Sequence, residues 1–189
     1  MLITKTTPQG IDWYIQQLQT RLYDELMDKW TTDSYTPVYY SYGRCYRNKT
    51  SNGWVAEVFT GGEYKEVYWN DTLDAISFFG ISDRIDFNKQ NKADVHLVFF
   101  VNLKKIKSSI THRADEEIRN DVQSIIGKSG FAFNLQSIEL WLDNVLKEYP
   151  GIRRDKGLMA VDMHPIHCFR FNLSIIYDAN KNCEKIKLN

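Results

Sequence analysis

The spacing of hydrophobic residues changes several times along the chain, and each change predicts a different element. Near the start, apolar residues recur at three- and four-residue steps, the spacing of one helix face: Ile11, Ile15, Leu18, Leu22 and Leu26. Thr7 suits the N-cap, Pro8 suits the first helical position, and a polar run follows Trp30. The pattern therefore predicts a leading helix within residues 1–30.

The next segment is typical of β-structure. A strand is expected over about 37–47, and the Asn52-Gly53 dipeptide after it favours a hairpin, because both central residues of that turn take positive φ. Gly61-Gly62 indicates a second hairpin between two further aromatic-rich strands. Residues 37–69 are therefore predicted to form a three-stranded antiparallel meander.

The middle of the chain mixes irregular and regular patterns. The segment from Asn70 to Ala93 predicts a loop or a short strand that carries Phe78 and Phe79. Residues 93–104 form the clearest strand in the sequence, with apolar side chains at alternating positions and also between them. We expect the centre of this strand to be covered on both faces.

The last third predicts two helices and a strand. Apolar stripes at helical spacing indicate helices over about 114–127 and 134–149, the second of which ends at Pro150-Gly151. Alternating apolar residues from Phe169 to Tyr177 predict a half-buried closing strand within 161–178, a natural neighbour for 93–104. The remaining residues, 179–189, form a polar tail.

These elements predict a single α+β domain. Its mostly antiparallel sheet should have helices packed on one face. The other face and the hairpin tips are expected to be free to contact a partner. The domain would comprise the leading helix (1–30), the meander with the long strand (37–105), the two helices (114–149), the closing strand (161–178) and the tail (179–189).

Charge and cysteine content narrow the functional classes. The chain has 24 basic and 24 acidic residues, and a neutral chain is a poor candidate for non-specific nucleic-acid binding. The three cysteines, Cys45, Cys168 and Cys183, form no CxxC pair, which favours free thiols in a reducing compartment. No signal peptide and no run of membrane-spanning length is found, so we expect a soluble protein made in the cytoplasm.

Metal-binding and nucleophilic sites are weakly indicated. His164, His167 and Cys168 could ligate zinc together with His96 or His112. However, the proline between the two histidines is incompatible with helical spacing, and positions 164 and 167 of a strand point to opposite faces. Cys168 lies beside His167, but adjacent strand residues also face opposite sides, and no GxSxG motif is present.

Four aspartates and a glycine pair are the other candidates for enzyme chemistry. Asp71, Asp74, Asp83 and Asp86 could provide acid/base groups or bind a divalent cation. Aspartate is also common in turns, and this preference accounts for the four aspartates without a catalytic role. Gly61-Gly62 lacks the GxGxxG spacing and the following helix of a phosphate-binding loop. We therefore expect no enzyme activity, no cofactor and no metal.

Two binding surfaces carry more of the sequence signal. Arg44, Arg47 and Lys49 alternate with aromatic residues, and Arg153 and Arg154 form a second basic group. This pattern fits contact with nucleic acid or an acidic partner, or an edge strand protected by charge. The aromatic residues that follow could fill the core or make contacts between subunits: Tyr64, Tyr68, Trp69, Phe78 and Phe79.

Three stretches resemble a known group of viral proteins. "YGRCYRN", "AEVFTGGEYKEVYWNDTLDAISFFG" and "ADVHLVFFVNLKKI" are similar to the neck, ring and tail-completion proteins of tailed bacteriophages, especially crAss-like and other Bacteroidetes phages. The similarity covers roughly residues 40–105. The order of the other elements fits tail-terminator-like proteins, which have a leading helix, a β meander, a helical insertion and a final strand.

The resemblance implies a structural virion protein with no catalytic residues. Such subunits form closed rings, typically six- or twelvefold, between the portal and the tail, and neighbours join through sheet edges and loops. The inner loops of such a ring line the channel through which DNA leaves. On this basis the basic residues would face channel DNA or an acidic partner, and the aromatic residues would make assembly contacts. The alternative is a non-enzymatic module that binds nucleic acid or protein.

Overall fold

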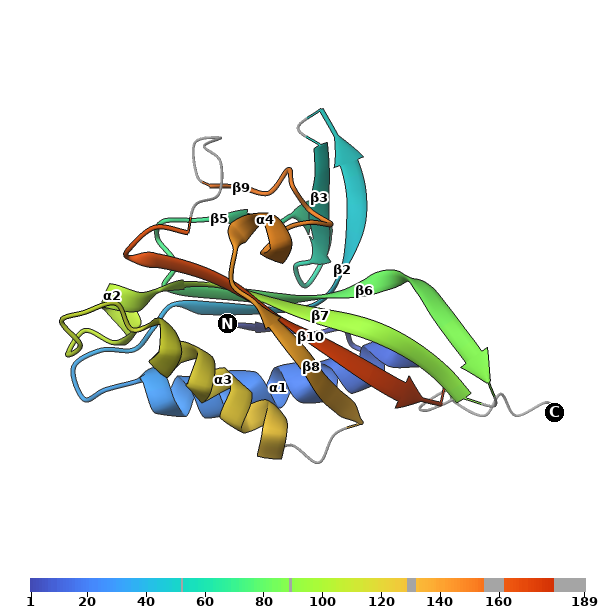
Figure 1. Cartoon of the computed structure of the whole chain (residues 1–189), viewed down its shortest axis with the longest axis horizontal. Coiled ribbons are helices and arrows are strands. Elements are labelled where there is room, and N and C mark those ends of the chain that lie inside the picture. The colour runs from blue at the N-terminus through green and yellow to red at the C-terminus, as the bar shows by residue number, and fades with distance from the viewer. Residues whose placement is uncertain (52, 89, 129–131, 155–161, 179–189) are drawn as a thin grey trace.

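The computed structural model describes residues 1–178 except 52, 89, 129–131 and 155–161. Figure 1 shows a twisted sheet with two helices beneath it and an upright hairpin above it. The helices are α1 (Ile11–Trp30), α2 (Leu103–Ile106), α3 (Asp115–Lys128) and α4 (Leu142–Val145). The strands are β1 (Leu2–Ile3), β2 (Tyr39–Thr50), β3 (Gly53–Phe59), β4 (Tyr64–Glu66), β5 (Tyr68–Trp69), β6 (Ala75–Asn88), β7 (Gln90–Asn102), β8 (Phe133–Glu139), β9 (Arg153–Arg154) and β10 (Ile166–Tyr177).

One eight-stranded sheet organises the described residues. Its order is β4-β3-β2-β6-β7-β10-β8, with β1 beside β2. The β1–β2 and β2–β6 pairs are parallel and the other pairs of this sheet are antiparallel. A separate parallel pair joins β5 to β9. The predicted α+β class with a mostly antiparallel sheet is confirmed, as are the antiparallel order β2-β3-β4 and the pairing of β10 with β7. The predicted extent of the meander to residue 69 is wrong, because its third strand ends at Glu66, and Tyr68 and Trp69 pair with β9 instead.

Strand β2 belongs to two parts of this sheet. Its first residues pair with β6, whereas Cys45 to Thr50 pair with β3, and the register shifts between Ser41 and Arg44. Gly43 lies at this irregularity, where the absence of a side chain eases a change of strand direction. The second half of β2 and its partner β3 therefore stand upright from the main sheet in Figure 1.

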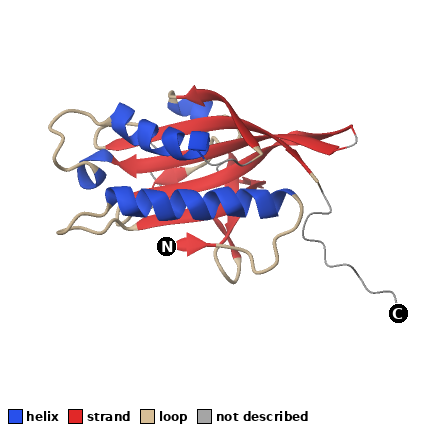
Figure 2. Cartoon of the chain, turned by 90° about the horizontal axis from the view of Figure 1, so that it is seen from below, coloured by secondary structure: helices blue, strands red, loops and turns tan. Residues whose placement is uncertain are grey.

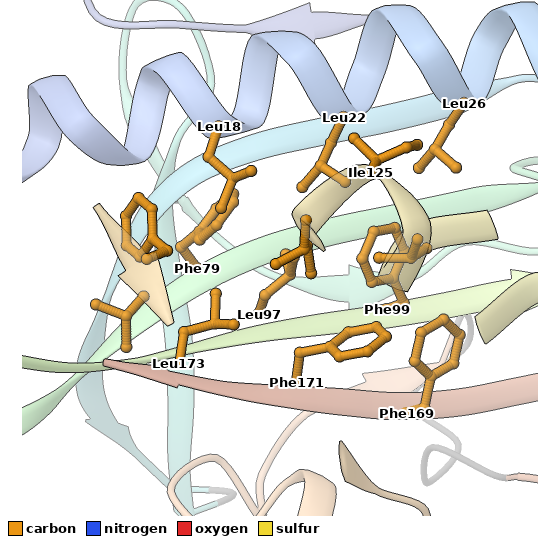
Figure 3. Packing of buried hydrophobic residues seen from close by; sticks show 14 of the residues in the cluster. Leu18, Leu22, Leu26, Phe79, Leu97, Phe99, Ile125, Phe169, Phe171 and Leu173 are labelled. Carbon is orange, nitrogen blue, oxygen red and sulfur yellow. The ribbon is translucent and has the colours of Figure 1, made fainter. Parts of the chain in front are cut away.

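Helices α1 and α3 pack on one face of the sheet, as Figure 2 shows. Figure 3 shows the leucine stripe of α1 and Ile125 of α3 over aromatic side chains from the central strands. Phe99 and Phe169 of neighbouring strands stack there, with ring centroids 5.2 Å apart and planes 7° apart. Each large apolar side chain buried in this way stabilises the fold by roughly 1.5–3 kcal/mol.

The opposite face of the sheet is covered too, which corrects the expectation that it is free. A second core cluster joins β3, β5, α4 and residues 149–152 to the central strands. Trp69 stacks on Phe100 there at 6.1 Å, and Tyr149 contacts Phe78 edge-on. As predicted, β7 is therefore covered on both sides at its centre.

The expectation of a loop or short strand at 70–93 was wrong. Ala75–Asn88 forms β6, a strand of 14 residues between β2 and β7. Phe78 and Phe79 point to opposite faces and enter different core clusters. An apolar run of this kind is typical of a strand buried on both faces, and the acidic residues around it hid that signal.

The predicted helix at 134–149 was also wrong. Phe133–Glu139 forms the edge strand β8, which pairs with β10, and only Leu142–Val145 are helical. The apolar residues of this segment fit the period of a helix or that of a strand. As a strand, the segment pairs with backbone groups at the edge of β10, which a helix would have left unpaired.

The ends of the other elements agree in part with expectation. Helix α1 ends at Trp30 as predicted, but its N-cap is Gly10 with a φ of 53°, so Thr7 and Pro8 lie outside the helix. Helix α3 confirms the predicted helix at 114–127. The polar tail 179–189 lies outside the described residues.

Candidate assembly and basic surfaces

The aromatic residues predicted as assembly contacts separate into two groups. Tyr64 and Tyr68 are exposed at 45 % and 49 %. Trp69, Phe78 and Phe79 are buried in the two core clusters. For these three residues the assignment as contacts between subunits is wrong, because β5 and β6 turn them into the chain's own core. Only the two tyrosines stay available for assembly.

The upright hairpin carries a basic surface around one indole ring. We name the basic hairpin patch as Arg47, Lys49 and Trp54. The Arg47 guanidinium lies 4.6 Å from the Trp54 ring centroid and the Lys49 ammonium lies 5.9 Å from it. Lys49 and Trp54 are directly opposite across the β2–β3 ladder, which fixes this arrangement. Trp54 was not among the residues predicted from the sequence.

The second predicted basic group lies close to this patch. Gly151 donates its backbone N–H to the Trp54 carbonyl at 2.8 Å, and β9 follows two residues later. Arg153 is half-buried in β9, and the side chain of Arg154 lies outside the described residues. The structure thus brings two basic segments together that are about 100 residues apart.

Arg44 does not join the basic hairpin patch. It follows the opposite alternation of β2 from Arg47 and Lys49, so it faces the other side of the strand. There its guanidinium lies 4.7 Å from the Tyr46 ring and 3.6 Å from the Asp12 carboxylate. The predicted role of Arg44 in the same surface is therefore corrected.

The four candidate aspartates do not converge. Asp74 is buried and holds a structural position: it accepts hydrogen bonds from Tyr35 and from the Val38 N–H, and lies 2.7 Å from the Lys105 ammonium. Burial acts to raise the pKa of Asp74, but these partners outweigh burial and the pKa lies below its ordinary value. Asp71 and Asp86 are exposed, and the side chain of Asp83 lies outside the described residues.

His167 lies in a polar cluster beside an open pocket of about 530 Å³. Its Nδ1 lies 3.2 Å from Asp162 and its Nε2 lies 3.2 Å from an Arg119 nitrogen. Arg113 also approaches Nδ1 at 3.3 Å, so His167 is held between Asp162 and two arginines. Arg113 donates to Asp162 at 2.6 Å, and this bond and the His167 bond overcome the effect of burial and lower the pKa of Asp162.

This cluster fits neither metal binding nor base catalysis by His167. Both ring nitrogens lie within hydrogen-bonding distance of other side chains, so neither is open to a metal ion or to a substrate proton. Within the described residues no three side chains of histidine, cysteine, aspartate or glutamate come close enough to hold a metal ion. Burial raises the pKa of the neighbouring Cys168 well above its usual range, so its thiol stays neutral.

His96 lines a second groove, of about 390 Å³, on the other face of the sheet. Its Nε2 lies 3.2 Å from the Tyr149 hydroxyl, which also accepts a hydrogen bond from the Cys45 thiol at 3.3 Å. Burial, with Arg170 and Lys147 nearby, lowers the pKa of His96 to about 3. Glu148 pairs with Arg170 in the same groove. The charged groups here are matched, and they serve to hold α4 on the sheet.

The β6–β7 hairpin provides an apolar surface that sequence reasoning missed. Ile85 and Phe87 are exposed at 46 % and 76 % on its distal part. The alternation of Ile85 and Phe87 is a usable signal for a strand, but the polar residues around them favour the prediction of an irregular segment. Figure 1 shows this hairpin reaching beyond the helices that cover the sheet.

Comparisons with known proteins identify no relative. No protein-family model matches the chain, and no curated protein matches its sequence. Among the described residues, no helix combines the length and apolar character needed to cross a membrane.

Proposed function

We propose that the chain is a structural virion protein, a subunit of a closed ring in the neck or tail of a tailed bacteriophage. In this role it joins the portal to the tail and lines the DNA channel, after synthesis in the host cytoplasm. It acts without enzyme activity or cofactor. Its partners are further copies of the chain, in a six- or twelvefold ring, and the adjacent portal, neck or tail proteins.

One observation carries this proposal: the exposed apolar tip of the β6–β7 hairpin. Phe87 and Ile85 lie on a strand pair that extends past its own core. Exposed apolar groups on a projecting hairpin favour contact with another protein. The resemblance of residues 40–105 to phage neck and tail-completion proteins, and the α+β order of elements, support the same role.

Assembly is tested by measuring mass in solution. Light scattering after size exclusion, over a concentration series, should give a discrete oligomer whose mass is a whole multiple of 22.2 kDa. A closed ring stops at one size, because every subunit uses both of its contact surfaces. A protein that stays monomeric at every concentration, or grows without limit, would contradict a self-assembling ring.

The alternative function, a nucleic-acid-binding module, is favoured by the basic hairpin patch. Lys49→Glu should weaken binding to DNA and reduce the dependence of log K on log salt by about one counterion. The matched control is Lys104→Glu, which makes the same charge change at an exposed position of α2. Fluorescence anisotropy with a labelled oligonucleotide, at several salt concentrations, measures both quantities.

Three results of this experiment are distinct. If Lys49→Glu weakens binding and Lys104→Glu does not, the result supports contact between the basic hairpin patch and DNA, in a ring or in a module. Equal losses for both variants would assign binding to net charge and contradict a role for the patch. Tight DNA binding by a strict monomer would favour the module over the ring.

A further inference from the structure

Two exposed apolar surfaces lie at opposite ends of the same strands. The first, named the hairpin tip, consists of Ile85 and Phe87. The second, named the receiving patch, consists of Leu140 and Trp141, which are exposed at 41 % and 78 % and line one pocket. Strand β10 runs between the two ends, from Ile166 to Tyr177, a length of about 40 Å.

The hairpin tip continues the core face of the sheet beyond its cover. Ile85 is opposite Ala93, which is opposite Ile175, and both of these partners are buried in the helix-side core. Phe87 is aligned with Tyr177 through Asn91, one step further out. Tyr177 still contacts Tyr14 of α1, with ring centroids 6.0 Å apart. Phe87 therefore projects from a face that is apolar elsewhere, just where α1 no longer covers it.

The receiving patch surrounds an incomplete edge of the same sheet. Strand β8 pairs with β10 from Arg170 to Ile175, so within the described residues Ile166–Phe169 have no strand on their outer side. The open pocket of about 530 Å³ lies at this place, and Leu140 and Trp141 form its apolar wall. Its floor is the hydrogen-bonded cluster around His167, which holds the pocket in shape.

The charges of the two surfaces are complementary. Residues 83–92 of the hairpin contain three basic and two acidic side chains. The pocket is lined by two arginines and three carboxylates, those of Asp115, Glu116 and Asp162. The hairpin is therefore net positive and the pocket net negative. Arg84 and Glu116 are accessible to a partner, with side chains 84 % and 75 % exposed.

We propose that the hairpin tip of one copy docks into the receiving patch of the next copy, with Phe87 packed against Trp141. This inference rests on the proposed ring function and names its contact between neighbours. Because the two surfaces are different and lie at opposite ends of the subunit, the contact is head-to-tail. Head-to-tail contacts form rings when the rotation between neighbours closes.

Disulfide trapping tests the contact directly. Phe87→Cys and Trp141→Cys are made as separate proteins in a Cys183→Ser background, where Cys45 and Cys168 are buried. Mixing the two proteins under mild oxidation should give a covalent dimer joined through positions 87 and 141. The matched control replaces Phe87→Cys by Ile176→Cys, which is exposed at the same end of the sheet but on its opposite face. A dimer of equal yield from the control pair, or none from the 87–141 pair at high protein concentration, overturns the docking.

A complementation experiment tests the direction of the contact. Phe87→Asp and Trp141→Asp should each reduce the oligomer to monomer, because each removes one of the two surfaces. A mixture should form dimers and nothing larger, since one intact hairpin tip meets one intact receiving patch. Both positions are exposed, so thermal melting should change little, and Phe87→Ser and Trp141→Ser replace any variant that unfolds.

The outcomes separate this inference from the ring proposal. A wild-type ring that neither variant disturbs overturns the docking and leaves the ring. Specific 87–141 cross-links in open chains of unlimited length retain the docking and overturn the closed ring. A wild-type monomer that forms no cross-link overturns both, and points to the receiving patch as a site for a different protein.

Discussion

Replacing Gly80 with alanine should lower the free energy of unfolding by about 3 kcal/mol, near the upper end for overpacking a core. Gly80 lies in β6, opposite His96 of β7. A Cβ at this position would overlap His96 Nε2 and Tyr149 Oη, and would lie 2.6 Å from His96 Cε1. Because His96 and Tyr149 are buried and hydrogen-bonded to each other, neither side chain has space to withdraw.

Urea denaturation of the purified variant measures this change, with Gly62→Ala as its control. Gly62 is exposed, and a Cβ there has no neighbour within 4 Å, so the free energy of unfolding of this variant should stay within about 0.5 kcal/mol of the wild-type value. The double variant Gly80→Ala, His96→Ala should lose less free energy of unfolding than the two single variants lose together. The reason is that His96→Ala removes the side chain with which the new Cβ overlaps. Simple additivity would show that the clash is not the cause.

Acid should destabilise the protein through His96. Burial and the nearby positive charges lower the pKa of this histidine from its ordinary value of 6.5 to about 3. Between these two values the unfolded chain binds a proton that the folded chain does not, so stability falls as the pH falls. The slope is about 1.4 kcal/mol per pH unit, and the loss is on the order of 5 kcal/mol over the whole window. Stability from this group is fully present above pH 6.5.

Denaturant unfolding at a series of pH values measures the slope in the wild type and in His96→Gln. Glutamine keeps a hydrogen-bonding side chain but does not titrate. In the variant, the number of protons taken up on unfolding should therefore be smaller by about one, and the slope should fall accordingly. His112→Gln is the control, because it removes an imidazole whose side chain is 72 % exposed. An unchanged slope in His96→Gln would contradict the assignment, since other acid-sensitive groups such as Asp74 would then account for all of the pH dependence.

The groove that contains His96 and the cluster that contains His167 show why charged groups in a pocket do not by themselves indicate catalysis. In both, the histidine is buried and its hydrogen bonds go to residues that join separate elements. Tyr149 connects the segment after α4 to β7 and β2, and Arg119 connects α3 to β10. These contacts hold the layers on the sheet.

Local sequence patterns were sufficient where one period was clear. The 3.6-residue stripes predicted α1 and α3, and alternation predicted β7 and β10 and their pairing. The glycine turns predicted the meander, and Gly53 and Gly61 indeed have φ values of 107° and 100°. In each case the residues that fix the element are neighbours in sequence, so the signal needed no knowledge of the rest of the chain.

The sequence by itself determined the α+β class, the helices α1 and α3, the meander and the long paired strands, because their local periods and turns permit few alternatives. Only the tertiary structure decided that Phe78, Phe79 and Trp69 are core. Phe78 and Phe79 lie on the part of β6 between β2 and β7, which is buried on both sides, whereas Trp69 of β5 packs on Phe100 from the face opposite the helices. Tertiary contacts also made 133–139 a strand, because the edge of β10 supplied its partners. The two exposed surfaces follow from the same cause: Phe87 and Trp141 are exposed because the chain's own layers end before they reach them.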